Sequence, residues 1–337
     1  MCYLKILLYS EGKNLFSKSG VGRALKHQMD ALIHNGVDFT TDENEEYDVA
    51  HINTIGTGAA KLIKKCKKKG IPVVYNTHTT YEDFRDSFLF SNLAAPFIKK
   101  RIKKLYGSAD YLISPSVYTL GVVRNYGINI PGEVISNGVE NSQFLKNIEF
   151  ADSFKKEYNI NSPLVICVGL PFRRKGILDF CEIAEKMPDV RFIWFGANIA
   201  SMVTSDVRKK IKNPPKNVSF PGYVSNETII GAYSAADLFF FPTYEENEGI
   251  VVLEALSIKC PIVLRDIPVY KEWLEDGVDC FKGKNNEEFI SKIKICIEEK
   301  KIVEKITENG KLKAEERDLK KIGKKLEEVY KKVKENK

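Results

Sequence analysis

The 337-residue sequence lacks several patterns that mark common protein classes. No run approaches the roughly 18 apolar residues that a membrane-spanning helix requires. The N-terminal apolar run is too short for a signal sequence, so it is predicted to be a buried strand. The loops contain neither a P-loop nor a GxGxxG run, which counts against a kinase or a dinucleotide-binding enzyme. Any contact with a membrane is therefore expected to be peripheral.

The seven cysteines are scattered, odd in number and never arranged as CxxC. This argues against a zinc site and a disulfide framework, and it favours a reducing cytoplasm. Most cysteines are expected to fill the core. No DxD-type acidic pair follows a predicted strand, so we expect no metal and no other cofactor.

Apolar residues make up 43% of the chain and charged residues 29%, as in an ordinary globular protein. The net charge of +7 is concentrated in two basic runs, 61–69 and 99–104. The first run is best explained as a solvated helix face. Nearby aromatic residues occupy the apolar helix face and do not form a stacking platform, so nucleic-acid binding is not expected.

Short apolar runs alternate with helical stretches along most of the chain. Their β-branched and aromatic content is typical of strands buried on both faces of a parallel sheet. Predicted strands cover 4–9, 49–53, 72–76, 111–114, 133–136, 164–168, 191–195, 218–220, 238–241 and 261–264, and predicted helices include 22–35, 177–186 and 249–257.

The strand series restarts after the polar stretch 141–163. We therefore predict an α/β protein with two Rossmann-like, doubly wound domains, at 1–160 and 161–315. Their strand ends should face a central ligand cleft. Apolar residues three and four positions apart predict a last helix, 316–337, which is expected to return to the first domain.

An acidic loop with a glycine follows the predicted strand 238–241. Gly249 at a helix start allows close backbone approach, and the free N–H groups of the helix favour an anion. Glu246 can accept hydrogen bonds from sugar hydroxyls, and Glu254 can reach a ribose diol. A capping cluster of acids is an equally good explanation of this loop taken alone.

A basic loop follows the predicted strand 164–168. Arg173, Arg174 and Lys175 lie at a strand-to-helix turn, where basic side chains can pair with a pyrophosphate. One basic loop and one acidic, glycine-containing loop in the same domain suit a nucleotide diphosphate that carries a polyol.

At this point the chain resembles the family 4 glycosyltransferases, which have the GT-B fold. The resemblance rests on two glutamates separated by seven residues, Glu246 and Glu254, with Gly249 between them. The segments Lys175-Gly176, Ser136-Asn137-Gly138-Val139 and Phe239-Phe240-Phe241-Pro242 follow in family order.

The resemblance implies that Glu246 holds the hydroxyls of the donor sugar, Glu254 the ribose and Lys175 the diphosphate. The backbone at Gly249 and Ile250 would face the leaving phosphate. The family often has an arginine where this chain has Leu170. Arg173 or Arg174 is expected to supply that charge.

In the first domain, Gly20 and Gly22 belong to a run, Ser19 to Arg23, that matches the family's glycine loop facing the donor phosphates. A plain tight turn is the alternative. His78 stands where the family has a histidine that contacts the transferred sugar, whereas His51 is expected to be structural. The resemblance also implies retention of the anomeric configuration without a metal.

The acceptor prediction rests on the basic amphipathic stretch 93–106. On a helix, Phe97, Ile98, Ile102, Leu105 and Tyr106 fall on one side, and Lys99, Lys100, Lys103 and Lys104 fall on the other. Such a helix can lie on an anionic leaflet, although it can also be an ordinary helix packed on the sheet.

A closer resemblance, to bacterial glycolipid synthases, is carried by 18–27, 82–88, 245–254 and 265–269. It implies a UDP-hexose donor, either UDP-glucose or UDP-galactose. It also implies a diacylglycerol or monoglucosyl-diacylglycerol acceptor, with Glu82 and Arg85 near the acceptor. A solvated loop is an equally good explanation of their charges. We therefore predict a cytoplasmic hexosyltransferase peripherally associated with the inner face of the membrane. The alternatives are a polysaccharide or soluble-sugar acceptor, or a non-catalytic nucleotide-sugar-binding protein.

Overall fold

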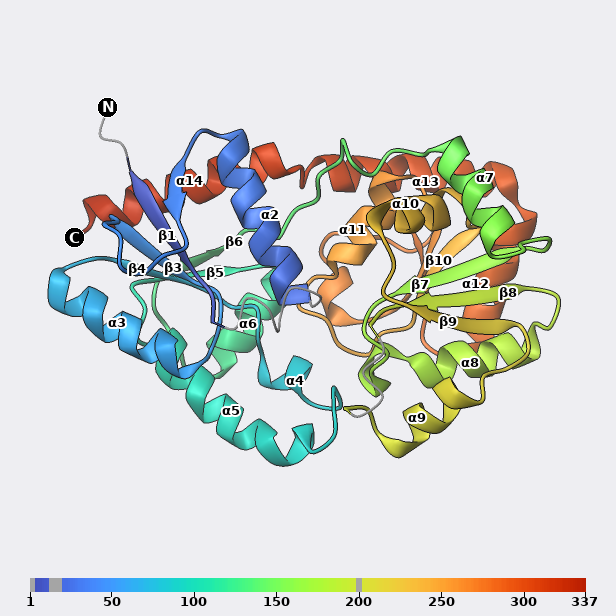
Figure 1. The fold of residues 1–337 in the computed structure, drawn as a ribbon, viewed down its shortest axis with the longest axis horizontal. Helices are drawn as coiled ribbons and strands as arrows, with labels where there is room; N and C mark the ends of the chain where they lie inside the picture. The colour runs from blue at the N-terminus through green and yellow to red at the C-terminus, as the bar shows by residue number, and fades with distance from the viewer. Residues whose placement is uncertain (1–3, 12–19, 198–201) are drawn as a thin grey trace. The chain divides into compact units, whose positions relative to one another are not determined.

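The computed structural model describes residues 4–11, 20–197 and 202–337. The chain divides into two compact units (Figure 1). Unit 1 consists of Met1–Phe84, Asn92–Val139 and Arg317–Lys337, and unit 2 of Arg85–Ser91 and Glu140–Glu316. Each unit contains a six-stranded parallel sheet between helices, so the predicted doubly wound α/β fold is confirmed. None of the helices in the described ranges is long and apolar enough to cross a bilayer.

The sheet of unit 1 has the strand order β2-β1-β3-β4-β5-β6. Its strands are short and almost wholly buried at the centre, as expected for a sheet covered on both faces. They are β1 (Lys5–Tyr9), β2 (Asp38–Thr40), β3 (Val49–Ile52), β4 (Val73–Asn76), β5 (Tyr111–Ser114) and β6 (Gly132–Val134). The helices are α2 (Gly20–His34), α3 (Thr57–Lys69), α4 (Tyr81–Phe84), α5 (Ser91–Tyr106), α6 (Val117–Asn125) and α14 (Leu319–Glu335).

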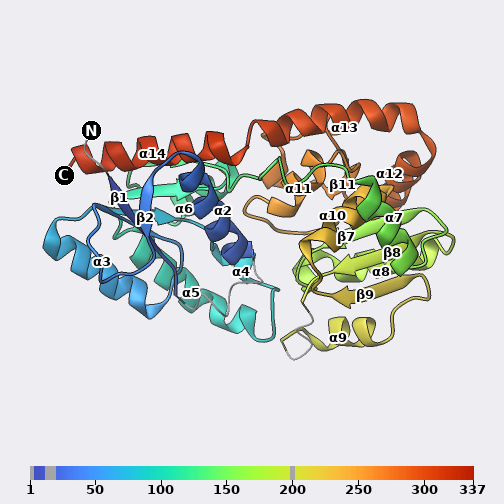
Figure 2. The ribbon, with the colours of Figure 1, turned by 45° about the horizontal axis from the view of Figure 1, so that its top comes forward.

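Two apolar clusters hold the layers of unit 1 together. On one face of the sheet, α3, α5 and α6 contribute buried residues such as Leu62, Ile102 and Val123. On the other face, α2 and α14 contribute Leu32, Leu326 and other buried residues. The two pairs of helices α3/α5 and α2/α14 lie on opposite sides of the sheet in Figures 1 and 2.

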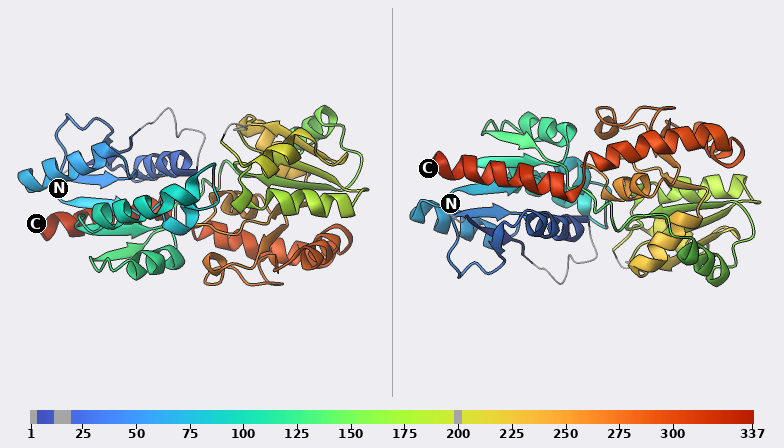
Figure 3. Two further views of the ribbon diagram at one scale, coloured as in Figure 1. Left: turned by 90° about the horizontal axis from the view of Figure 1, so that it is seen from below. Right: turned by 90° about the horizontal axis from the view of Figure 1, so that it is seen from above.

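The C-terminal helix α14 packs on α2 and thereby returns the chain to unit 1 (Figure 3). Its buried stripe is Leu319, Ile322, Leu326, Val329 and Val333, at intervals of three and four residues. Gly323 lies on the same face, where a Cβ would be 2.1 Å from the carbonyl oxygen of Ala31. The helices can approach this closely because Gly323 has no side chain.

The sheet of unit 2 has the strand order β12-β11-β10-β7-β8-β9. Its strands are β7 (Leu164–Val168), β8 (Arg191–Phe195), β9 (Val218–Gly222), β10 (Leu238–Phe241), β11 (Ile262–Arg265) and β12 (Phe281–Gly283). Its helices are α7 (Ile148–Glu157), α8 (Ile177–Lys186), α9 (Ser205–Lys212), α10 (Asn226–Ala235), α11 (Ile250–Ser257), α12 (Asn286–Glu298) and α13 (Lys300–Glu315), with short 3-10 turns η1 (Arg173–Lys175) and η2 (Pro268–Tyr270).

The main differences from the sequence prediction are two edge strands and one domain boundary. β2 and β12 were not predicted, because each has only three residues with no continuous apolar run. We predicted the first domain to end at residue 160, whereas unit 2 begins at Glu140. The reason is that α7 packs on α10 (Figure 2), so the polar stretch 141–163 belongs to unit 2.

Candidate active site

In unit 2, two functional loops begin at the carboxyl ends of the neighbouring strands β7 and β10. The β7 loop leads through η1 to α8, and the β10 loop leads to α11. They meet at Gly176, which has φ +78° and whose Cβ would lie 2.4 Å from the carbonyl oxygen of Pro242. A glycine is required there, and it lets the basic and acidic side chains of the two loops come together.

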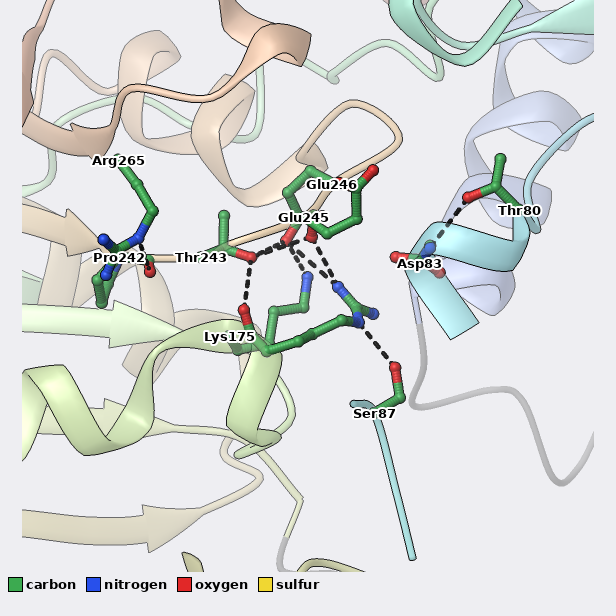
Figure 4. Close-up of polar contacts among 10 residues, drawn as sticks. Thr80, Asp83, Ser87, Lys175, Pro242, Thr243, Glu245, Glu246 and Arg265 are labelled. Atoms are coloured by element: carbon green, nitrogen blue, oxygen red, sulfur yellow. Dashed lines mark hydrogen bonds and ion pairs between the residues drawn. The ribbon is translucent and has the colours of Figure 1, made fainter. Parts of the chain in front are cut away.

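Glu246 is the centre of this charge cluster and is buried (Figure 4). Lys175 Nζ donates a hydrogen bond to Glu246 Oε1, and Thr243 Oγ1 donates to the same oxygen at 2.9 Å. Arg174 Nη1 lies 3.9 Å from it. A buried carboxylate requires such compensation, and the same cations are available to an anionic ligand.

The two arginines predicted as alternatives have different environments. The Arg174 side chain is 10% exposed, and its Nη1 donates to the carbonyl oxygen of Glu245 at 2.8 Å. The Arg173 side chain is 58% exposed and pairs with Asp206 at 3.2 Å. The geometry therefore favours Arg174 as the arginine of this site.

The helix α11 begins at Ile250, and Gly249 caps it with φ +97°. Its N-terminal N–H groups are the kind of group that binds an anion. Glu254 lies fully buried in the same helix, where Tyr233 Oη donates to it at 3.5 Å. Tyr270 is fully buried beneath the loop: its Oη would be 3.1 Å from a Cβ at Gly249.

The buried Arg265 supports the β10 loop through a hydrogen bond and a ring contact. Arg265 Nε donates to the carbonyl oxygen of Pro242 at 2.9 Å, and its guanidinium lies 3.7 Å from the ring centroid of Tyr244. Tyr244 Oη donates to Asp179 at 3.0 Å, and Asp179 pairs with Arg265 at 3.3 Å. We did not assign Thr243, Tyr244 or Asp179 from the sequence. Of these three residues, only Thr243 had a sequence feature that could have identified it: its position three residues before Glu246.

In unit 1, His78 follows β4 and is 7% exposed. Its Nε2 is hydrogen-bonded to Asn53 Oδ1 at 3.0 Å, and burial lowers the pKa of His78 to about 4. The ring is therefore neutral at pH 7. His51 is fully buried and hydrogen-bonded to Tyr330 Oη of α14 at 2.7 Å, which agrees with the structural role expected for it.

The other candidate residues predicted for the first domain are placed as follows. Gly20 and Gly22 form the first turn of α2, and nothing lies within 4 Å of a Cβ at Gly20. Ser19 and Lys18, also named in the sequence patterns, lie outside the described residues. Glu82, in α4, accepts a hydrogen bond from Tyr126 Oη. Arg85 is exposed and begins the short segment Arg85–Ser91, which belongs to unit 2.

The amphipathic prediction for α5 requires one correction. Ile102, Leu105 and Tyr106 are buried in the core of unit 1, but Phe97 is 76% exposed. Phe97 shares the exposed side with Leu93, Lys100 and Lys104, which lie four, three and seven residues from it. The apolar face of α5 thus packs on the sheet, and its outer face is basic with two apolar side chains.

A groove of about 720 Å³ opens along this outer face. Tyr81, Pro96 and four lysines line it: Lys99, Lys100, Lys103 and Lys104. Lys99 Nζ lies 5.0 Å from the ring centroids of both Tyr81 and Tyr126. The groove therefore concentrates positive charge beside apolar side chains.

The described cysteines are all buried thiols, and no group of three or more His, Cys, Asp or Glu side chains in the described ranges is arranged to hold a metal ion. Cys2 lies outside those ranges. Arg174 and Lys175, which lie against Glu246, are cations that could offset ligand charge in unit 2.

Two family models match the chain in sequence. Residues 149–313 match the model of glycosyl transferases group 1, and residues 40–143 match that of glycosyltransferase family 4. The match to the first model covers both loops of the candidate site.

Proteins and structures of known identity agree with these matches. The α-galactosylglucosyldiacylglycerol synthase of Streptococcus pneumoniae is 29% identical over 79% of this chain and 73% of its own length. The crystal structure of Anabaena HepE with UDP-glucose has a TM-score of 0.80 over 98% of this chain and all of its own, at 17% identity. The fold is thus that of GT-B glycosyltransferases.

The processive diacylglycerol α-glucosyltransferase of Acholeplasma laidlawii is 43% identical to the chain over 334 residues, which are 98% of each protein. An alignment of this length spans both units. The chain is therefore a glycosyltransferase and belongs to glycosyltransferase family 4.

Proposed function

We propose that the protein transfers an α-glucosyl unit from UDP-glucose to diacylglycerol, and then to the monoglucosyl product, at an anionic membrane surface. The observation that carries this proposal is the 43% identity, over 98% of both chains, to a processive diacylglycerol α-glucosyltransferase. The charge cluster of unit 2 and the basic groove of unit 1 support the two halves of the reaction separately.

The donor half is supported by the groups around Glu246. Its carboxylate is suited to accept hydrogen bonds from hexose hydroxyls, and Glu254 from a ribose diol. Lys175, Arg174 and the first N–H groups of α11 are suited to the diphosphate. These roles are assigned by the family resemblance together with the contacts described above.

We propose a retaining transfer without a metal. The bond between the anomeric carbon and the diphosphate oxygen breaks, and the acceptor hydroxyl attacks from the same face. The leaving phosphate takes the proton of that hydroxyl. Lys175 and Arg174 offset the negative charge that develops on the UDP, as pre-organised charges do in a dry site. Activity that is unchanged by EDTA is the expected result.

The acceptor half is supported by the outer face of α5. Four lysines around one groove favour an anionic leaflet, where each basic residue near the surface adds about 1 kcal/mol to membrane affinity. The exposed Leu93 and Phe97 can enter the apolar part of that leaflet. Neutral His78, buried at a strand end, is suited to contact the transferred sugar.

The test is a transfer assay with labelled UDP-glucose or UDP-galactose, and with diacylglycerol or monoglucosyl-diacylglycerol in vesicles that contain phosphatidylglycerol. We expect glucose transfer to both acceptors, retention of configuration by NMR, and loss of transfer in Glu246→Gln. Transfer from UDP-galactose alone would change the donor assignment.

The lipid assignment has its own control. Simultaneous substitution of Lys99, Lys100, Lys103 and Lys104 by glutamine should abolish sedimentation with anionic vesicles, while UDP binding by unit 2 is retained. If the protein does not bind vesicles and glucosylates only soluble sugars or polysaccharide, the proposal of a lipid acceptor is wrong. UDP binding with no transfer to any acceptor would identify a non-catalytic binding protein.

A further inference from the structure

The segment Arg85–Ser91 lies between two helices of unit 1 but belongs to unit 2. It follows α4 directly, and its last residue begins α5. Two of its residues have backbone angles in the left-handed region: Asp86 at φ +52° and Phe90 at φ +64°. A phenylalanine rarely adopts this conformation, so the contacts of the segment with unit 2 must hold it in place.

Two of those contacts are made with Arg174. The Ser87 Oγ accepts a hydrogen bond from Arg174 Nε at 2.7 Å, and the carbonyl oxygen of Asp86 accepts one from the Arg174 N–H at 3.2 Å (Figure 4 shows Ser87). The N–H of Leu89 donates to the carbonyl oxygen of Met202 at 2.7 Å. Ser87 is 7% exposed, so its bond to the guanidinium is sheltered from water.

Other bonds of Arg174 lead to the donor loop. Its Nη1 donates to the carbonyl oxygen of Glu245, and its own carbonyl oxygen accepts from the Tyr244 N–H at 2.8 Å. Because the guanidinium is planar, Ser87 on Nε and Glu245 on Nη1 together determine the plane in which it lies. Without Ser87, one of these two restraints is lost.

The same segment ends in exposed apolar side chains. Leu89 is 41% exposed and Phe90 is 73% exposed, and along the chain they are followed by the exposed Leu93 and Phe97 of α5. The lysines around the groove of α5 come next in sequence. Phe90 is only three residues from Ser87. A leaflet that binds Phe90 therefore acts on the segment that holds Ser87.

We propose that Ser87 is a positioning residue for Arg174, and that Arg85–Ser91 makes the donor site responsive to a lipid surface. The inference rests on the proposed function and deepens it. When Phe90 enters the leaflet, the segment holds Ser87 against Arg174, and the affinity for the nucleotide diphosphate rises. Membrane contact and donor binding are then coupled.

The experiment measures UDP binding by calorimetry, which needs no acceptor. Ser87→Ala should weaken UDP binding about tenfold, as expected for loss of a hydrogen bond to a charged group. Ser87→Thr should restore it. Vesicles with phosphatidylglycerol should raise the UDP affinity of the wild type about fivefold, within the usual range of coupling between two sites. Phosphatidylcholine vesicles should not.

Two further variants separate the steps. Phe90→Asn keeps a residue that tolerates positive φ and should remove the vesicle effect while leaving UDP affinity without vesicles unchanged. Ser142→Ala removes another serine of unit 2, whose hydroxyl bonds Glu140, and should change neither quantity. Thermal unfolding of each variant checks that the fold is intact.

Wild-type UDP affinity in Ser87→Ala would overturn the positioning role. An equal vesicle effect in Phe90→Asn would overturn the coupling. Either result would leave the proposed transferase function standing. A wild-type protein that does not bind UDP would overturn the proposed donor and this inference with it.

Discussion

The two units contain the same kind of sheet, but they bury different polar groups. Among the described residues, every buried Asp, Glu, Lys or Arg lies in unit 2: Glu140, Glu246, Glu248, Glu254, Arg265, Asp279 and Lys282. Unit 1 buries only neutral polar types and histidine, among them His27, His51, Asn53, Asn76 and His78. All four histidines of the chain are in unit 1.

This difference matches the chemistry proposed for each unit. Burying a charge is costly unless an opposite charge or several hydrogen bonds compensate it. Unit 2 bears that cost at the site proposed to hold a diphosphate and a hexose, where Lys175 and Glu246 compensate each other. Unit 1 avoids the cost and offers neutral groups, as suits an uncharged sugar or lipid hydroxyl.

The largest expected effect comes from the charges of unit 2. Glu246→Gln should reduce transfer on the order of 10²–10³-fold, as is typical when one pre-organised electrostatic group of an active site is lost. The rate with saturating UDP-glucose measures this effect. Glu308→Gln, which removes an exposed carboxylate paired with Lys259 in the same unit, is the matched control. Equal losses in the two variants would show that charge in general, and not this site, matters.

The second prediction concerns pH and unit 1. Burial lowers the pKa of His27 to about 4 and that of His51 to about 3, as it also lowers that of His78. The unfolded chain binds protons first as the pH falls below about 6.5, so stability is complete above that pH and is lost toward pH 4. Each histidine contributes about 3 kcal/mol to this loss.

Hydrogen exchange of the two units between pH 7 and pH 5 checks the second prediction. Protection should fall in unit 1 before it falls in unit 2. His51→Gln should make the stability of unit 1 depend less steeply on pH. Simultaneous loss of protection in both units would contradict the expectation that unit 1 is destabilised first.

The third prediction concerns the surface of unit 1. Lys103→Gln should lower affinity for anionic vesicles about fivefold, since one basic residue near a leaflet adds about 1 kcal/mol. Sedimentation at low salt measures it, and the difference should shrink as salt is raised. Lys301→Gln alters an exposed lysine of unit 2 as the matched control and should leave vesicle binding at the wild-type level.

The smallest expected effect concerns the hydrogen bond that Tyr244 makes in the donor loop. Tyr244→Phe removes the hydroxyl that donates to Asp179, a bond expected to contribute about 1 kcal/mol. The KM for UDP-glucose should rise a few-fold with kcat little changed. Tyr158→Phe, in a residue whose ring stacks on Phe154 away from the loop, is the control. A fall in kcat alone would count against a positioning role in donor binding.

Local sequence patterns predicted most of the fold. β5, β7, β8 and β10 have the predicted bounds, and α8 begins and ends as predicted, because each is a strong apolar run or a clear helical period. The boundary at residue 160 was wrong because the contact of α7 with α10 joins segments some 70 residues apart. No local pattern records such a contact.

The candidate site shows the same division. Position after predicted strands, together with the family resemblance, singled out Lys175, Glu246, Gly249 and Glu254, since loops that follow parallel strands meet at one edge of a sheet. It could not choose between Arg173 and Arg174. Neighbouring residues of a short turn point in different directions. Only the packed structure directs the Arg174 guanidinium to the carbonyl oxygen of Glu245 and the more exposed Arg173 to Asp206.

The sequence by itself determined the alternation of strands and helices, the order of the motifs and hence the family. The tertiary structure decided which side of α5 faces outward and where the segment Arg85–Ser91 binds. The physical reason is that periodicity specifies a stripe on a helix but not its partner. Partners are selected by burial and hydrogen bonding between residues far apart in the chain.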